Sequence, residues 1–333
     1  MTLSDVTVVI RAAGERTKEL CAAIVAEQLG DPTKVHIVCE RPFHKALQRS
    51  IEIAVAEDAK WSVFLDADVL LRRNALHDML TELENAPRPF YMMNFLILDR
   101  GFCGFSYGGV HCYTTKLLEE AYQFIPMAST EQRPETYLVR QMAKAGYPWV
   151  ESATIVGLHG YEQFYRDLYR TTFVRAAKFA RLRGYMLRRY RAGYAYDDES
   201  KVMLWGLIDG ILHSERDVYA PLDVGFYAER SSQVLEMLGI AERGPLSAAD
   251  RPSYVEDVIA SFVPDEDYLA HFWKLVPVSS EPRYGGLPKP RHPLRVVLSR
   301  VKRLAQSGLA YLGVSAEHRR EANRADACLP NDL

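Results

Sequence analysis

The sequence of 333 residues predicts an α/β fold, in which helices pack on both faces of a sheet and a helical region follows toward the C-terminus. In the N-terminal half, short apolar runs alternate with segments of helical periodicity, which is typical of strands joined by helices. Beyond residue 160 helical periodicity dominates. With 48% hydrophobic and 25% charged residues, the composition is that of a globular chain and excludes a largely disordered or fibrous one.

The elements follow from local patterns. Residues 6–10 (VTVVI) are β-branched and bounded by turn residues, so they predict a buried strand. Residues 19–29 (ELCAAIVAEQL) carry apolar residues at helical spacing, and Gly30-Asp31-Pro32 ends that helix. By the same criteria we predict strands at 35–39, 61–65 and 90–98, helices at 44–57 and 76–83, and a strand-like run at 153–158.

The C-terminal half is predicted to be helical over 161–212, 229–240 and 253–262. Residues 294–312 place apolar side chains on one helical stripe with Arg and Lys beside it. Such a helix either docks on the rest of the protein, which we favour, or makes peripheral contact with the inner face of a membrane. The predicted boundaries are a core at 1–160, a helical extension at 161–281, a linker at 282–293, a basic amphipathic helix at 294–313 and a tail at 314–333.

Charge and cysteine content exclude several classes of protein. Lys and Arg number 41 against 43 Asp and Glu, so no global charge indicates a nucleic-acid partner. The five cysteines form no CxxC pair and no regular framework, which favours reduced thiols. The first residues lack a signal-peptide pattern, and no stretch of about 20 apolar residues occurs. We therefore expect a cytoplasmic protein.

The sharpest candidate motif is Asp66-Ala67-Asp68, which directly follows an apolar strand in SVFLDADVLL. Two carboxylates at positions i and i+2 that leave a strand end are able to converge on one hard cation. The carboxyl ends of strands are also where open α/β sheets bind ligands. The alternative is an ordinary strand-to-turn junction, because Asp is common there.

The succession VTVVIRAAGERT, VHIVCE, HKALQRSIEIA and SVFLDAD resembles the N-terminal half of GT-A fold glycosyltransferases, family 2 in particular, over roughly residues 4–160. Gln48 and Ser50 stand where the family has Asn and Gly. The resemblance implies a Rossmann-like mixed sheet and a Mn²⁺- or Mg²⁺-dependent transfer of sugar from a nucleotide-diphosphate sugar. The implied acceptor is a glycan, a lipid-linked molecule or a small molecule, in surface polysaccharide or glycoconjugate synthesis.

Carried over by position, the resemblance places Glu40 at the nucleobase, although Glu40 could equally cap a turn. It places Asp66 near the ribose and the metal ion, and it makes Asp68 the direct metal ligand. We also expect Arg11, at the end of the first strand, to contact the nucleotide sugar.

The segment RPETYLVRQMAKAGYPW resembles the family's helix that carries the general base of inverting members, and Glu135 takes that position. Pro134 and Gln141 depart from the family pattern, and a helix start equally explains Pro134 and Glu135. Gly108-Gly109 is similar to an acceptor-side glycine motif, and we expect the following His111 to be structural.

His159 lies between glycines after an apolar run, which suits a third metal ligand on an exposed turn, although a lone His is more often structural. The basic run that follows forms either a solvated helix face or a cationic wall for a diphosphate or an anionic acceptor. Tyr side chains interleave this run and serve either to stack on sugars or to pack. The basic residues are Arg166, Arg170, Arg175, Lys178, Arg181, Arg183, Arg188, Arg189 and Arg191, and the tyrosines are Tyr185, Tyr190, Tyr194 and Tyr196.

Three other functions remain open. VFLDADVLL also resembles the first motif of haloacid-dehalogenase phosphatases, with Asp66 as nucleophile and Asp68 as acid/base, and Asp197-Asp198 is the nearest match to that family's later acidic cluster. Residues 12–16 (AAGER) suggest a sugar nucleotidyltransferase, but the second glycine of its phosphate loop is missing. The third is a non-catalytic, glycosyltransferase-like scaffold.

Overall fold

The structure is a computed structural model that describes residues 3–86, 89–126, 134–214, 224–244, 246, 251, 253–272 and 283–284. Residues Met1–Gly286 form one compact unit, to which both the predicted core and the predicted helical extension belong. The predicted basic helix at 294–313 and tail at 314–333 lie outside the described residues, as does the predicted linker apart from residues 283–284.

The core is a mixed sheet with strand order β2-β1-β3-β6-β5-β7-β4, and β8 pairs with β7. Strand β1 runs parallel to β2 and β3, whereas β6 is antiparallel to both β3 and β5. The short β4 is antiparallel to β7. The strands are β1 (Val6–Arg11), β2 (Val35–Val38), β3 (Trp61–Asp66), β4 (Val69–Leu71), β5 (Met92–Asp99), β6 (Gly104–Thr114), β7 (Trp149–His159) and β8 (Arg283–Tyr284).

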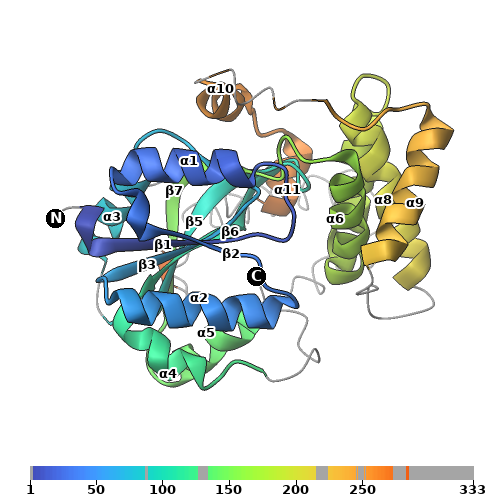
Figure 1. The fold of residues 1–333 in the computed structure, drawn as a ribbon. Helices are drawn as coiled ribbons and strands as arrows, with labels where there is room; N and C mark the ends of the chain where they lie inside the picture. Colours follow the sequence, from blue (N-terminus) through green and yellow to red (C-terminus); the bar gives the residue numbers. More distant parts are fainter. Residues whose placement is uncertain are drawn as a thin grey trace, which may run out of the picture. The chain divides into compact units, whose positions relative to one another are not determined.

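Helices cover both faces of this sheet (Figure 1). Successive side chains of a strand point to opposite faces, so Val8 and Ile10 of β1 belong to the same buried cluster as α1 and α3, while Val9 packs with α2, α4 and α5. The predicted α/β class with helices on both faces is therefore confirmed. These helices are α1 (Lys18–Leu29), α2 (Phe43–Glu57), α3 (Ala75–Asn85), α4 (Leu118–Tyr122) and α5 (Pro134–Lys144).

The predicted helical region follows β7, and α6 and α8 lie side by side in it (Figure 1). Tyr169 and Phe173 of α6 are buried in a cluster that includes Val202 of α8 and Tyr227 of α9. The helices are α6 (Tyr165–Lys178), α7 (Arg183–Gly193), α8 (Asp198–Ser214), α9 (Val224–Leu238), α10 (Tyr254–Ser261) and α11 (Glu266–Phe272).

Three strands were not predicted from the sequence: β4, β6 and β8, the last of which lies in the predicted linker and pairs with β7. The strand β4 has three residues, which is too short for a periodic pattern to be recognised. The strand β6 contains Gly108 and Gly109, and Gly109 has a φ of 74° that other residues rarely adopt. The two glycines, which resemble an acceptor-side motif in the sequence, therefore lie within a strand.

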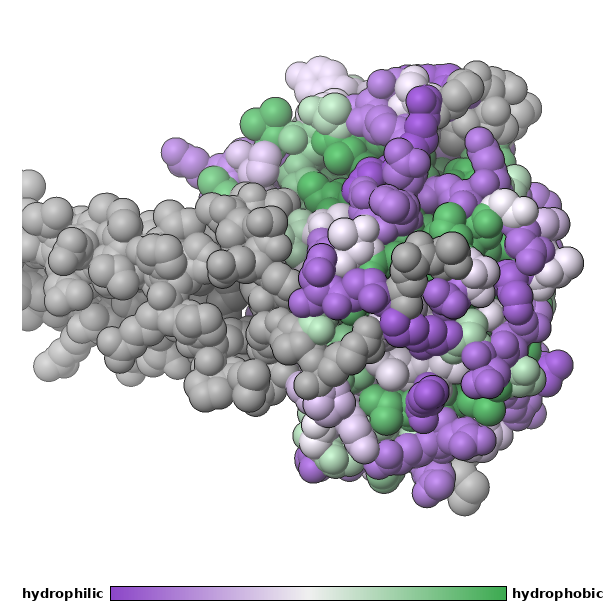
Figure 2. All heavy atoms as spheres, turned by 90° about the vertical axis from the view of Figure 1, so that its left-hand side faces the viewer, coloured by the Kyte–Doolittle hydropathy of each residue, from purple (hydrophilic) through white to green (hydrophobic). Residues whose placement is uncertain are grey.

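The face shown in Figure 2 mixes hydrophilic residues with small hydrophobic groups, as on an ordinary water-facing surface. Among the helices that the structure describes, none is both long enough and apolar enough to span a membrane.

Close packing of α8 on α6 gives a first testable prediction. A Cβ atom on Gly206 would lie 2.4 Å from the backbone oxygen of Tyr169. Ala normally stabilises a helix relative to Gly by up to about 1 kcal/mol, but the backbone of α6 cannot move aside freely. We expect Gly206→Ala to lower the free energy of unfolding by about 1–3 kcal/mol, measured by urea denaturation.

Gly184 of α7 provides the control, because the nearest neighbour of a Cβ there is the flexible end of Arg188 at 3.6 Å. Gly184→Ala should leave the stability unchanged or raise it by about 0.5 kcal/mol. If the two variants had the same free energy of unfolding, the prediction that α6 and α8 pack closely at Gly206 would be wrong.

Candidate active site

Three of the predicted site residues converge in the structure. Asp66 is the last residue of β3, Asp68 follows in the turn before β4, and His159 is the last residue of β7. The pairing of Val69 with His159 across the β4–β7 ladder brings the carboxylate of Asp68 beside the imidazole. Asp68 Oδ1 lies 3.3 Å from His159 Nε2, and one ligand atom from each of the three residues lies within 4.8 Å of the others.

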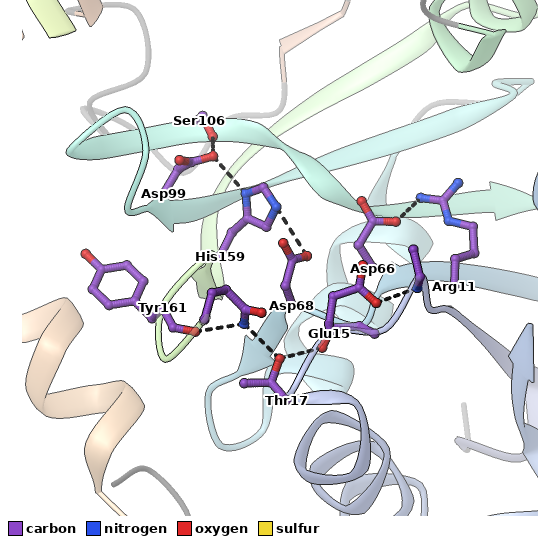
Figure 3. A network of polar contacts seen from close by, with 12 residues as sticks. Arg11, Glu15, Thr17, Asp66, Asp68, Asp99, Ser106, His159 and Tyr161 are labelled. Carbon is purple, nitrogen blue, oxygen red and sulfur yellow. Dashed lines mark hydrogen bonds and ion pairs between the residues drawn. The ribbon is translucent and has the colours of Figure 1, made fainter. Parts of the chain in front are cut away.

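The imidazole of His159 is held from behind by Asp99, the last residue of β5 (Figure 3). Because a carboxylate accepts hydrogen bonds, His159 Nδ1 donates to Asp99 Oδ2 at 2.8 Å, and this fixes the orientation in which Nε2 faces Asp68. Arg175 donates to both oxygens of Asp99, at 2.6 and 2.8 Å. We expected His159 on an exposed turn, but it ends a strand with 16% of its side chain exposed.

The charges of Asp68, Asp99 and His159 shift one another's pKa values. Burial disfavours a charged imidazole, but the carboxylates of Asp68 and Asp99 outweigh it and raise the pKa of His159 well above its usual value. Burial also opposes ionisation of Asp68 and Asp99, yet His159 and Arg175 lower the pKa of both carboxyl groups. A metal ion bound at Nε2 would compete with the proton that these carboxylates favour on the imidazole.

Asp66 has the opposite character. Burial raises the pKa of Asp66 to about 6, against the opposing charge of Arg11 and with the help of the neighbouring Asp68 and Glu135. Carboxylates this close to one another repel, so a bound cation would favour their ionised forms.

The donor set fits a divalent metal ion of the kind that the sequence predicts. Two carboxylates, from Asp66 and Asp68, and one imidazole, from His159, present ligand atoms within 4.8 Å of one another. Carboxylate oxygens suit Mg²⁺ and Mn²⁺, and an imidazole nitrogen favours Mn²⁺ of the two. Asp99 is the carboxylate that metal-ligating histidines commonly contact through their second nitrogen.

Arg11 pairs with two carboxylates of the site, and its contact with the nucleotide sugar stays a prediction. Its buried guanidinium donates to Asp66 Oδ1 at 2.7 Å and to Glu135 Oε1 at 2.5 Å. Arg11 thereby links Asp66 at the end of β3 to Glu135 in the first turn of α5. Burial opposes ionisation of Glu135, but Arg11 and His111 outweigh it and lower the pKa of this carboxyl group.

Glu40 lies away from this cluster. It is exposed just beyond β2 and lines a groove with Arg49 and Ile53 of α2. Its assignment to the nucleobase stays a prediction.

Three arginines of the basic run pair with carboxylates, whereas Arg170 lines a pocket with Asp68 and His159. Arg175 pairs with Asp99, Arg188 with Asp267 and Arg189 with Asp265, so these guanidinium groups join elements of the protein. The hydroxyl groups of Tyr185 and Tyr190 donate to the backbone oxygens of Phe102 and Gly101, which makes these two tyrosines packing residues. Tyr196, by contrast, is 89% exposed.

The structure also bears on the phosphatase alternative. Asp197, one of the two residues most similar to the later acidic cluster of those enzymes, lies just before α8 and pairs with Arg100. The cluster that gathers around Asp66 contains Asp68 and His159 instead.

No protein-family model matches the sequence, and no curated protein matches it. Solved structures show similarity in fold. A mannosyltransferase from Pyrobaculum calidifontis in complex with GDP-Man and Mn²⁺ is 13% identical with a TM-score of 0.36, and the match covers 82% of this chain and 84% of that chain. A glycosyltransferase involved in glycosylation of the major capsid of PBCV-1 is 14% identical with a TM-score of 0.33, over 44% of this chain and 80% of that one.

A third similar structure is a CMP:2-keto-3-deoxy-manno-octonic acid synthetase complexed with CTP. It is 14% identical with a TM-score of 0.32, and the match covers 46% of this chain and 92% of that chain. The chain is thus similar to glycosyltransferases and nucleotidyltransferases of the GT-A-like fold. At these values the likeness concerns the fold alone, so the function has to come from the residues of the site.

Proposed function

We propose that the protein is a metal-dependent glycosyltransferase that moves a sugar from a nucleotide-diphosphate sugar to an acceptor. The observation that carries this proposal is the convergence of Asp66, Asp68 and His159 at the ends of β3 and β7. Open α/β sheets bind ligands at the carboxyl ends of their strands. The buried contact between His159 and Asp99 supports it, because it holds the imidazole ready to ligate.

The residues of the chain have distinct roles in this proposal. Asp68 and His159 hold the metal ion, and Asp66 shares in holding it while Arg11 keeps its carboxylate in place. When bound, Mn²⁺ or Mg²⁺ supplies positive charge that stabilises the diphosphate as it leaves. Glu40 is our candidate for contact with the nucleobase.

The proposal leaves three classes of acceptor: a glycan, a lipid-linked molecule or a small molecule, with surface polysaccharide or glycoconjugate synthesis as the setting. A lipid-linked acceptor would fit peripheral membrane contact through residues 294–312, which lie outside the described residues.

Thermal unfolding with a panel of nucleoside diphosphates tests the proposal. A ligand at about 100 times its Kd stabilises the folded state by about 2.7 kcal/mol, or a rise in Tm of ~5 °C for a chain of this size. We expect UDP or GDP to give such a rise with Mn²⁺ present and a much smaller one with EDTA. If no nucleotide changed the Tm with or without metal, a non-catalytic scaffold would be the better description.

A second prediction concerns His159 alone. His159→Ala removes one ligand of the predicted metal site, so we expect Mn²⁺ affinity, measured by electron paramagnetic resonance, to fall by at least roughly 10–100-fold. His77→Ala on the exposed surface of α3 is the matched control and should bind Mn²⁺ like the wild type. Equal affinity in the two variants would make His159 a structural residue.

A further inference from the structure

A second histidine, His111 of β6, lies beside the proposed site with one ring nitrogen fixed and the other unpaired. His111 stands directly opposite Asn94 in the β5–β6 ladder, and its Nδ1 lies 2.7 Å from Asn94 Oδ1. An amide oxygen only accepts hydrogen bonds, so Nδ1 carries the proton and donates it. In the neutral ring, Nε2 then bears the lone pair.

The unpaired Nε2 faces a carboxylate. Glu135 Oε2 of α5 lies 3.9 Å from it, beyond hydrogen-bond distance but close enough for strong attraction if the ring became charged. His111 exposes 11% of its side chain, and within the described part of the chain Nε2 has no hydrogen-bond partner. Nε2 thus carries a lone pair that the hydroxyl group of a small ligand could approach.

Glu135 itself is a poor proton acceptor in this arrangement. Its Oε1 accepts from Arg11 at 2.5 Å and from the Tyr113 hydroxyl at 3.4 Å. These contacts favour the ionised carboxylate, and a base whose pKa is lowered has little tendency to take up a proton. Burial, together with the charges of Arg11 and His159 and against that of Glu135, lowers the pKa of His111, which keeps the ring neutral near pH 7.

The same strand also passes the metal site. A Cβ atom on Gly109 would lie 3.4 Å from His159 Cδ2, so the backbone of β6 runs alongside the ligand imidazole. His111 follows two residues later, roughly 7 Å further along the strand. A transferred sugar would lie along this stretch, between a diphosphate at the metal site and an acceptor at His111.

We propose that His111 is the general base of sugar transfer, with Asn94 fixing its tautomer and Glu135 stabilising the imidazolium that forms. This inference rests on the proposed function. The O–H bond of the acceptor breaks and its proton goes to Nε2, while the oxygen's electron pair forms the bond to the anomeric carbon. The bond from that carbon to the diphosphate oxygen breaks, and its electron pair leaves with the nucleotide diphosphate. Direct displacement of this kind inverts the anomeric configuration.

The first test needs no turnover. In protein labelled with ¹⁵N-histidine, the signals of His111 are identified by their loss in His111→Gln. We expect the neutral Nδ1–H tautomer in the wild type at pH 7.5. A neutral Nε2–H tautomer would overturn the proposal, because the nitrogen that faces Glu135 would then already carry a proton.

The second test is the pH dependence of Mn²⁺-dependent hydrolysis of the matching nucleotide sugar, with water as acceptor. His111→Gln should lower kcat by roughly 10²–10⁴-fold and remove the acid limb of the profile, while the Tm rise with nucleotide and Mn²⁺ stays. Asn94→Asp places a charge at Nδ1 and should move the acid limb to higher pH. A purely structural role of His111 would not move this limb.

Glu135→Gln separates the two candidate bases. If Glu135 only stabilises the imidazolium, this variant keeps an acid limb, shifted to lower pH, and loses less activity than His111→Gln. Near-normal hydrolysis by His111→Gln together with a large loss in Glu135→Gln would return the role of base to Glu135. In that case the proposed transferase would still stand, whereas it fails if no nucleotide sugar binds or is hydrolysed by the wild type.

Discussion

Asp68→Ala is expected to reduce sugar transfer by roughly 10³-fold or more and to leave the fold intact. A neutral methyl group cannot replace the carboxylate that lies 3.3 Å from His159 Nε2, and loss of the charge at the proposed metal site is worth several kcal/mol. The measurement is kcat for hydrolysis or transfer of the matching nucleotide sugar, together with the Tm rise that UDP or GDP gives with Mn²⁺. Asp68→Ala should lose both the activity and the Tm rise.

The matched control is Asp198→Ala. Asp198 begins α8 and pairs with Lys201 at the surface, with 46% of its side chain exposed. Removing it should leave both activity and nucleotide binding near wild type, because surface ion pairs contribute about 0–1 kcal/mol. Activity that survived in Asp68→Ala would refute the assignment of the metal site, whatever the control does.

Local patterns explain why most of the fold could be predicted. The strands β1 and β3 are continuous apolar runs, and α1 ends at Gly30, which adopts the left-handed conformation that favours glycine. The antiparallel β6 could not be predicted because its place between β3 and β5 depends on pairing across the sheet. Its two glycines are also more typical of a turn than of a strand.

Likewise, only part of the candidate site could be predicted from the sequence. Asp66, Asp68 and His159 could be picked out as candidates because the Asp66-Ala67-Asp68 motif and His159 each come straight after an apolar run. Their partners could not, because each pairing depends on tertiary packing. Arg175 of α6 lies 76 positions from Asp99 in the sequence, and only the folded chain brings it to the end of β5.

The partners of two arginines could not be predicted from the sequence. Arg11 pairs with Asp66 and Glu135, and Arg175 pairs with Asp99, which has 3% of its side chain exposed. One signal was available: Asp99 ends an apolar strand just as Asp66 does. In an α/β sheet, such strand-end acids are candidates for one shared site.

The second large effect should come from Arg175→Met. Asp99 has 3% of its side chain exposed, and Arg175 donates to both of its oxygens. Replacing the guanidinium with an apolar side chain of similar length leaves a buried carboxylate with only His159 as a charged partner. Breaking such a pair costs about 3–5 kcal/mol. We expect a loss of that size in the free energy of unfolding near pH 7, measured with urea.

The loss should depend on pH in one direction. Arg175 and His159 hold the pKa of Asp99, against the effect of burial, well below its unfolded value. This carboxylate therefore contributes stability that is present above about pH 4 and is lost as the pH falls. In Arg175→Met only the charge of His159 opposes burial, so the pKa of Asp99 is higher than in the wild type, and the difference in free energy of unfolding between the two proteins should narrow as the pH falls through that higher pKa.

Two further variants separate the buried charge from simple loss of packing. Arg188→Met breaks an ion pair in which the arginine side chain is 56% exposed, and it should cost no more than about 1 kcal/mol. Adding Asp99→Asn to Arg175→Met removes the uncompensated charge, so part of the lost stability should return. If the double variant were no more stable than Arg175→Met, and the loss did not change with pH, packing of the guanidinium against Phe102 would account for the effect instead.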